Sequence, residues 1–131
     1  MGMKPGKNCI DIGMVVKDID KSLAFYQDLL GLEKIGEMPL WFGTMHRMGF
    51  GGSFVKIIDP NESLPAVTQG LDKALGFRYL TFQVTNIDEV CEDCEKAGTP
   101  FDITKRELMP GVTIAMVQDP DGNVVEFVQR A

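Results

Sequence analysis

The chain has 131 residues, of which 44% are hydrophobic and 24% are charged. This composition fits one globular domain with a sizeable core and excludes a disordered or membrane-spanning chain. Nineteen acidic against thirteen basic residues leave a net charge of −6, which argues against a nucleic-acid partner. The start, MGMKPGKN, lacks the apolar core of a secretory signal, so we expect a cytoplasmic protein with no membrane partner.

The first half of the chain reads as a strand, a helix and three further strands. NCIDIGMVV (8–16) alternates in the manner of a strand. A helix follows directly, and Asp18 or Asp20 can cap its start. Gly51-Gly52 suits a two-residue hairpin turn between the last two strands. The three further strands are LEKIGEMPL (32–40), WFGTMHRMGF (41–50) and SFVKIID (53–59).

The second half repeats this order after a connecting stretch that is rich in turn formers. Its helix begins after Asn86 and ends at Gly98. Its strands are RYLTFQV (78–84), FDITKREL (101–108), GVTIAMVQ (111–118) and NVVEFVQ (123–129). Laying VVKDIDKSLAFY over QVTNIDEVCEDC aligns Ile19 with Ile87, which indicates a tandem duplication.

We therefore predict an α+β fold in a single domain, 1–131, built from two tandem β-α-β-β-β modules. Module one covers about 8–60, the connection about 61–77 and module two about 78–131. Neither module alone can cover both faces of its sheet. Together they would form a curved sheet with the helices outside and a cup-shaped site inside, where a small molecule can bind.

Two stretches resemble a known family. VVKDIDKSLAFYQDLLGLEKI is similar to the first strand and helix, and DPDGNVVEFVQ to the closing hairpin, of the vicinal oxygen chelate superfamily. That superfamily includes glyoxalase I, epimerases, extradiol dioxygenases and bleomycin-resistance proteins. The resemblance implies a homodimer, and in metal-dependent members a ligand on the first and last strand of each half. Those four positions hold Asp11, Lys56, Tyr79 and Glu126 here.

This residue set does not suit zinc or nickel, because a protonated lysine ammonium has no lone pair to donate. We therefore expect no metal ligand set and no cofactor. His46 is the only histidine, and if Gly51-Gly52 is the hairpin turn it points away from the face that carries Lys56. A one-residue slip would reverse this. Cys91 and Cys94 lie on an apolar helix stripe, which favours packing over redox chemistry.

The predicted cup face supplies the candidate site. The candidate catalytic residues are Lys56, Tyr79 and Glu126, and the candidate ligand-binding residues are Asp11, Trp41, Arg47, Thr81 and Gln83. In one interpretation Lys56 replaces the charge of the metal and neutralises Asp11 and Glu126 in a buried ionic cluster. In the other, Lys56 and Arg47 bind a small acidic or polar molecule over Trp41.

Two function classes remain open. The first is a metal-independent protein of the bleomycin-resistance kind that binds a small molecule without changing it. The second is a glyoxalase- or epimerase-like lyase or isomerase with an altered site, in which Glu126 and Lys56 transfer protons. Analogy of fold cannot choose between them, because one fold serves many functions.

Overall fold

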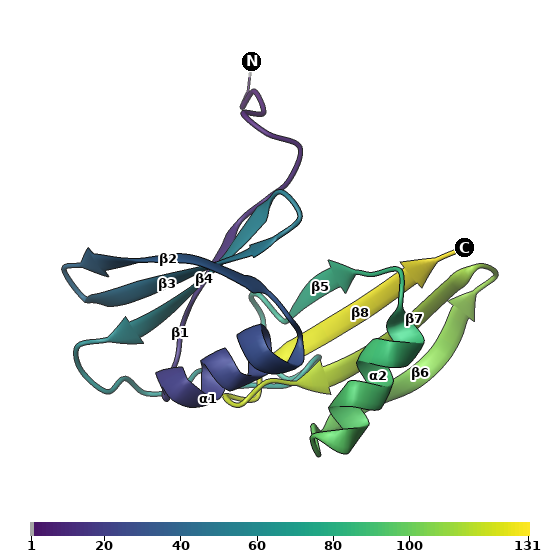
Figure 1. Cartoon of the computed structure of the whole chain (residues 1–131). Coiled ribbons are helices and arrows are strands. Elements are labelled where there is room, and N and C mark those ends of the chain that lie inside the picture. Colours follow the sequence, from purple (N-terminus) through teal and green to yellow (C-terminus); the bar gives the residue numbers. More distant parts are fainter. Residues whose placement is uncertain (1) are drawn as a thin grey trace. The chain divides into compact units, whose positions relative to one another are not determined.

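The computed structural model describes residues 2–131. These form two compact units, residues 2–65 (the N-terminal unit) and 66–131 (the C-terminal unit). Each unit contains a four-stranded mixed sheet and a helical segment in β-α-β-β-β order, and neither sheet closes into a barrel (Figure 1). The predicted α+β class and the tandem order of elements are confirmed.

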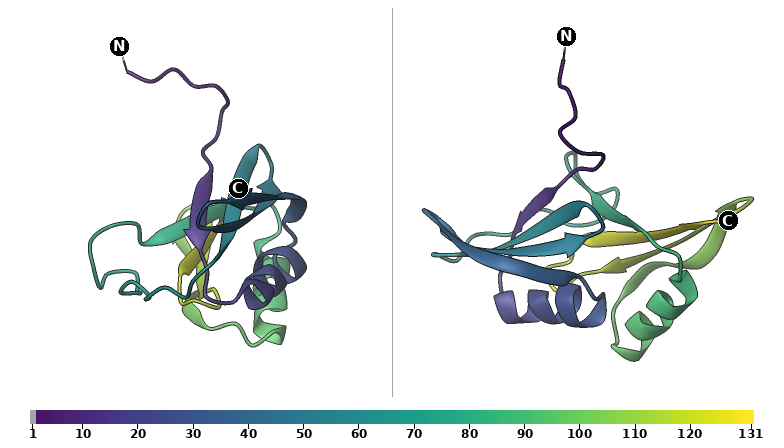
Figure 2. Two further views of the ribbon diagram at one scale, coloured as in Figure 1. Left: turned by 90° about the vertical axis from the view of Figure 1, so that its left-hand side faces the viewer. Right: turned by 45° about the horizontal axis from the view of Figure 1, so that its top comes forward.

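The N-terminal sheet has the strand order β1-β4-β3-β2, with β1 parallel to β4 and the other pairs antiparallel. The helical segment lies on one face of this sheet, where it contacts β4 (Figure 2). The elements are β1 (Ile12–Val15), α1 (Ile19–Leu23), the π-helical segment η1 (Ala24–Leu29), β2 (Glu33–Leu40), β3 (Gly43–Phe50) and β4 (Ser53–Pro60).

The β3–β4 hairpin has the register that its turn sequence predicts. Phe50 pairs with Ser53, so Gly51-Gly52 is a two-residue loop, and Gly51 has the positive φ (56°) that such loops require. This register places Arg47 opposite Lys56. It also places the next residue, His46, on the other face of the sheet, as predicted.

The first helix departs from the prediction after one turn. Asp18 caps it as predicted, accepting hydrogen bonds from two backbone N–H groups at 3.1 and 3.2 Å. The helix then widens, and Leu30 N–H donates to the Phe25 carbonyl over five residues at 2.9 Å. The wider turn brings two neighbouring aromatic side chains, Phe25 and Tyr26, into the core together. The predicted helix is present, and its second part is a π-helix.

The first strand is shorter than predicted, beginning at Ile12 instead of residue 8. The reason lies at Asp11, whose Oδ1 atom accepts the Phe54 backbone N–H at 2.7 Å. A side chain thus takes the place of the backbone acceptor that would extend the parallel ladder. The preceding Ile10 is 87% exposed.

The C-terminal sheet has the equivalent order, β5-β8-β7-β6, with β5 parallel to β8. Its helix contacts β7 and β8 (Figure 1). The elements are β5 (Tyr79–Gln83), α2 (Ile87–Lys96), β6 (Phe101–Met109), β7 (Val112–Gln118) and β8 (Val124–Arg130). The turn before β8 is held by the buried Asp119 carboxylate, which accepts the backbone N–H groups of Asp121 and Asn123 at 2.9 and 2.8 Å.

The second helix begins after Asn86, as predicted, but the Asn86 side chain does not cap it. The Gln129 side chain of β8 accepts the Ile87 N–H instead, at 2.7 Å. The predicted packing role of the cysteines is confirmed: Cys91 and Cys94 are buried, and burial raises both thiol pKa values, that of Cys94 to about 11. No helix in residues 2–131 is long and apolar enough to cross a membrane.

Candidate functional site

Four residues form a row across the N-terminal sheet, in the order Gly13, Lys56, Arg47 and Gly36. Paired residues on adjacent strands project from the same face, so the Lys56 and Arg47 side chains lie beside each other. The opposite face carries Ile57, which is fully buried. We call the face with Lys56 and Arg47 the helix-free face of this unit.

Apolar residues flank the two cations along their strands. Met45 pairs with Ile58 on one side, and both are buried. Phe54 lies on the other side, and the Arg47 guanidinium carbon sits over its ring, 4.9 Å from the centroid. Arg47 is therefore held near Lys56 by a cation–π contact, although both side chains are positive.

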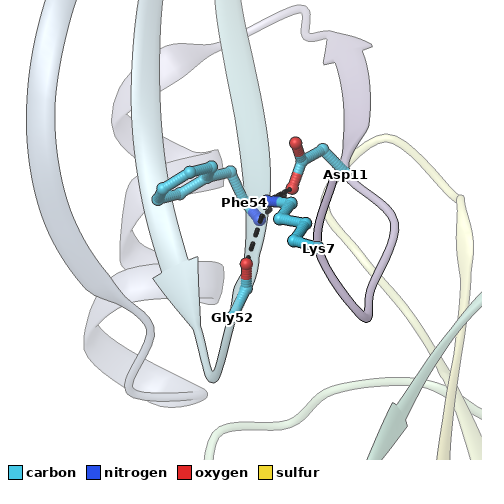
Figure 3. A network of polar contacts seen from close by, with 4 residues as sticks. All are labelled: Lys7, Asp11, Gly52 and Phe54. Carbon is cyan, nitrogen blue, oxygen red and sulfur yellow. Dashed lines mark hydrogen bonds and ion pairs between the residues drawn. The ribbon is translucent and has the colours of Figure 1, made fainter. Parts of the chain in front are cut away.

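A polar network borders this face at the start of β1 (Figure 3). Lys7 Nζ lies 2.7 Å from Asp11 Oδ1 and 2.9 Å from the Gly52 carbonyl oxygen, and 4.5 Å from the centroid of the Phe54 ring. The hydrogen bond from Lys7, followed by that from the Phe54 N–H, lowers the pKa of Asp11 below its usual range. The charge of Lys56 contributes least to this shift.

This network corrects part of the ionic-cluster interpretation. Asp11 forms its ion pair with Lys7 and not with Lys56. Neither Lys56 nor Arg47 forms an ion pair with a carboxylate within residues 2–65. Like charges directly opposite each other on adjacent strands are destabilising. The helix-free face thus carries two adjacent positive charges that no carboxylate of its own unit pairs.

Two other residues of this unit lie away from the row. Trp41 was expected in a strand, but it lies in the turn between β2 and β3 and is 88% exposed, so the strand prediction is wrong there. His46 is 7% exposed and faces away from Lys56. Its Nδ1 atom lies 3.1 Å from Glu37 Oε1, without the alignment of a hydrogen bond.

The C-terminal unit has a matching row, in the order Thr81, Glu126, Met116 and Ile103. The Thr81 hydroxyl donates a hydrogen bond to Glu126 Oε1 at 2.8 Å, which orients the carboxylate. The alternation of β5 places Tyr79, 53% exposed, and Gln83 on the face of Thr81. The structure thus gathers the candidates into two sets: Asp11, Arg47 and Lys56 in one unit, and Tyr79, Thr81, Gln83 and Glu126 in the other.

These donors do not fit the transition metal that the family resemblance implies. Asp11 Oδ1 already accepts two hydrogen bonds, and an ammonium ion such as that of Lys56 repels a divalent cation. Across residues 2–131, no three side chains among His, Cys, Asp and Glu gather closely enough to hold a metal ion.

Sequence reasoning missed four residues of the N-terminal site. Lys7 gives no pattern that sequence could detect, because it lies outside the strand and reaches Asp11 through a loop. Phe54 was assigned to a strand without a role. Gly13 and Gly36 did carry a signal, since glycine within a strand often marks a close approach of a ligand or of another backbone.

Comparisons with known proteins agree with this architecture. The sequence profile of the Glyoxalase/Bleomycin resistance protein/Dioxygenase superfamily matches residues 10–127. A probable lactoylglutathione lyase from Synechocystis sp. is 31% identical over 127 residues, covering 88% of this chain and 90% of the relative. Two solved structures share the fold. One is a glyoxalase family protein from Enterococcus faecalis (TM-score 0.75, 23% identity, 94% of this chain and 98% of that chain). The other is an antibiotic binding protein from a Streptomyces species (TM-score 0.73, 20% identity, 98% and 100%). The chain belongs to the glyoxalase/bleomycin resistance protein/dioxygenase superfamily.

Proposed function

We propose that this chain binds a small organic anion on the helix-free face of its N-terminal unit, with Arg47 and Lys56 holding the charged group and no metal taking part. The observation that supports this proposal is the cross-strand pairing of two cations that lack a carboxylate in their own unit. Such a pair destabilises a sheet unless something negative balances it. A carboxylate or similar group between the two side chains would supply that balance.

The surroundings of the pair favour an organic ligand over a bare inorganic ion. The Phe54 ring, which is only partly buried, lies on one side of the cations, and the buried apolar side chains of Met45 and Ile58 pack on the other. Small-molecule sites usually combine a few placed polar groups with apolar walls. The solved Streptomyces protein with this fold is named an antibiotic binding protein, so a binding role fits the fold.

Ligand binding tests this proposal. We expect a thermal-shift screen of metabolites and antibiotics to find stabilising anions, and elemental analysis to find no stoichiometric transition metal. Lys56→Met should weaken a binding anion about tenfold, because a hydrogen bond to a charged group contributes about 1.5–3 kcal/mol. Lys34→Met is the matched control, since Lys34 pairs with Glu37. Equal affinities in both variants would refute the proposal.

A lyase or isomerase activity is the second candidate. The Synechocystis relative, which is 31% identical to the chain, is named a probable lactoylglutathione lyase, and Glu126 is a carboxylate oriented by Thr81. In this alternative Glu126 acts as the base. An assay of lactoylglutathione chemistry decides it: turnover that Glu126→Gln abolishes while ligand binding persists would select the enzyme.

We also propose that the chain forms a homodimer through its edge strands. β2 and β6 end their sheets and carry exposed apolar side chains, namely Ile35, Met38, Leu108 and Met109. Exposed strand edges of this kind favour association. A monomer in light scattering at micromolar concentration would contradict the proposal.

A further inference from the structure

Two glycines flank the cation pair without a conformational reason. Gly13 in β1 pairs with Lys56, and Gly36 in β2 pairs with Arg47. Neither glycine has a positive φ, so any residue can adopt its backbone conformation. Glycine in a strand interior weakens the strand, because it loses more conformational entropy and has no side chain to pack. A positive φ therefore accounts for neither glycine.

The space above both glycines is empty. A Cβ atom added at Gly13 or at Gly36 would meet no atom within 4 Å. The contrast with Gly43 is clear, since a Cβ there would lie 2.3 Å from the Asp59 carbonyl oxygen. Close packing thus explains why residue 43 is a glycine, but it does not explain Gly13 or Gly36.

The C-terminal unit shows that the fold accepts side chains at these positions. Its row has Thr81 in the place of Gly13 and Ile103 in the place of Gly36, on the equivalent strands β5 and β6. The sheet order and the strand directions are the same in both units. A β-branched residue at either end of the row is therefore compatible with this architecture.

We propose that Gly13 and Gly36 are specificity-determining residues that keep the floor beside the cation pair clear, so that the site accepts an organic anion carrying a flat, ring-sized group. The proposal rests on the proposed function, because Arg47 and Lys56 hold the charged end of the same ligand. Strands lie about 4.8 Å apart, so each glycine leaves a strip of sheet surface of about that width free of side chains beside the pair. The register shift between Lys34 and Gly36 agrees with this role, since β-bulges often adjoin binding sites.

Two carboxylates of equal charge and different size test the proposal. Acetate and 2-naphthoate are titrated by NMR against the full chain and against Gly13→Thr and Gly36→Ile, which introduce the residue types of the second unit. Gly6→Thr is the matched control, because Gly6 precedes the first strand and has open space around it. Lys56→Met is measured alongside, and thermal unfolding of every variant is recorded.

The two glycines lie on opposite sides of the cation pair, so one ring can cover only one of them. We expect the variant on the side that the ring covers to weaken 2-naphthoate about tenfold or more, while acetate affinity changes less than about twofold in both variants. The unfolding temperature should not fall, since a β-branched residue suits a strand better than glycine does. Gly6→Thr should change neither affinity, and Lys56→Met should weaken both ligands.

Failure of this inference and failure of the proposed function give different results. If Lys56→Met weakens both carboxylates but the glycine variants bind 2-naphthoate normally, only the size role is wrong. If a glycine variant lowers the unfolding temperature, that glycine serves the fold and the inference is overturned. If Lys56→Met changes neither affinity, or the unmodified chain binds neither carboxylate at millimolar concentration, the proposed function is wrong and the inference fails with it.

Discussion

Replacing Lys56 by methionine should stabilise the protein in the absence of ligand. Lys56 faces Arg47 across the β3–β4 ladder, and neither has a carboxylate partner within residues 2–65. Methionine keeps the length and the apolar stem of lysine and removes only the charge. A residue that weakens the fold and strengthens anion binding is the pattern expected of a functional position.

The expected gain is small but measurable. Cβ atoms of directly opposed residues lie about 5 Å apart, and like charges there cost about 0.2–1 kcal/mol. Both side chains are half-buried, so water and salt screen part of the repulsion. Asp11, the carboxylate on which the charge of Lys56 acts, is bound by Lys7, and the effect of Lys56 on the pKa of Asp11 is the smallest of the causes. We therefore expect the free energy of unfolding to rise by about 0.5 kcal/mol at low salt.

Urea denaturation at low salt and at 1 M NaCl measures this gain. The effect should fade at 1 M salt, where the Debye length is about 3 Å. Lys34→Met is the control of opposite sign, because Lys34 Nζ lies 3.7 Å from Glu37 Oε1 and loses a weak ion pair.

The opposite sign for Lys56→Met would refute this reasoning. A loss of stability that is larger at low salt would mean that Lys56 neutralises a carboxylate, as in the ionic-cluster interpretation. Asp11, whose pKa the charge of Lys56 helps to lower, would be the candidate partner. A double-mutant cycle with Asp11→Asn would then show coupling between the two side chains, whereas additive effects would exclude that pair.

Three further predictions follow from local contacts. The pKa of Asp11 is lowered, so its contribution to stability is present above about pH 4 and is lost as the pH falls through the lowered pKa. Lys7→Met should raise the pKa of Asp11, which NMR titration measures. It should also speed hydrogen exchange at the Phe54 backbone N–H, which donates to Asp11. Cys94, buried and with a pKa of about 11, should resist alkylation at pH 8 while the half-buried Cys9 reacts. Gly98→Ala should lower the free energy of unfolding by about 1 kcal/mol, measured in urea, because Gly98 ends α2 with a φ of 74°.

Each of these predictions has a contradicting result. A Lys4→Met variant removes a charge from the same N-terminal stretch and should leave the pKa of Asp11 unchanged. If it raised that pKa as much as Lys7→Met does, the net charge of the stretch alone would explain the shift. Alkylation of Cys94 before unfolding would show that the thiol is accessible. Gly6→Ala is the control for Gly98→Ala, since Gly6 has no positive φ and should tolerate the change.

Turn chemistry and alternation predicted much of the fold. The pair Gly51-Gly52 set the register of β3 and β4, and with it the pairing of Arg47 with Lys56, because a two-residue loop admits only one register. The starts of both helices were predicted correctly, but the side chain that caps the second helix was not. Asn86 occupies the cap position that sequence assigned to it, yet Gln129, 43 positions along the chain, supplies the acceptor.

The candidate site divides in the same way. Arg47 and Lys56 share a face because the period of a strand is two and the turn fixes the register, and this can be read from the sequence. The partner of Asp11 could not be read from the sequence, because Lys7 reaches it through a loop that has no period. Trp41 was predicted in a strand because aromatic residues favour strands. It lies instead in the turn between β2 and β3.

The sequence by itself determined the tandem order of elements and the strand faces. These features are local, because alternation, turn residues and side-chain chemistry act over a few neighbouring residues. Only the tertiary structure decided that Lys7 takes Asp11 away from Lys56, and that Gly13 and Gly36 flank the remaining cation pair with open floor. Gly13, Lys56, Arg47 and Gly36 come from four different strands, and their meeting depends on the register and twist of the whole sheet, which no single segment encodes. Lys7 and Asp11 are only four residues apart, but the loop between them has no regular period that would predict their contact.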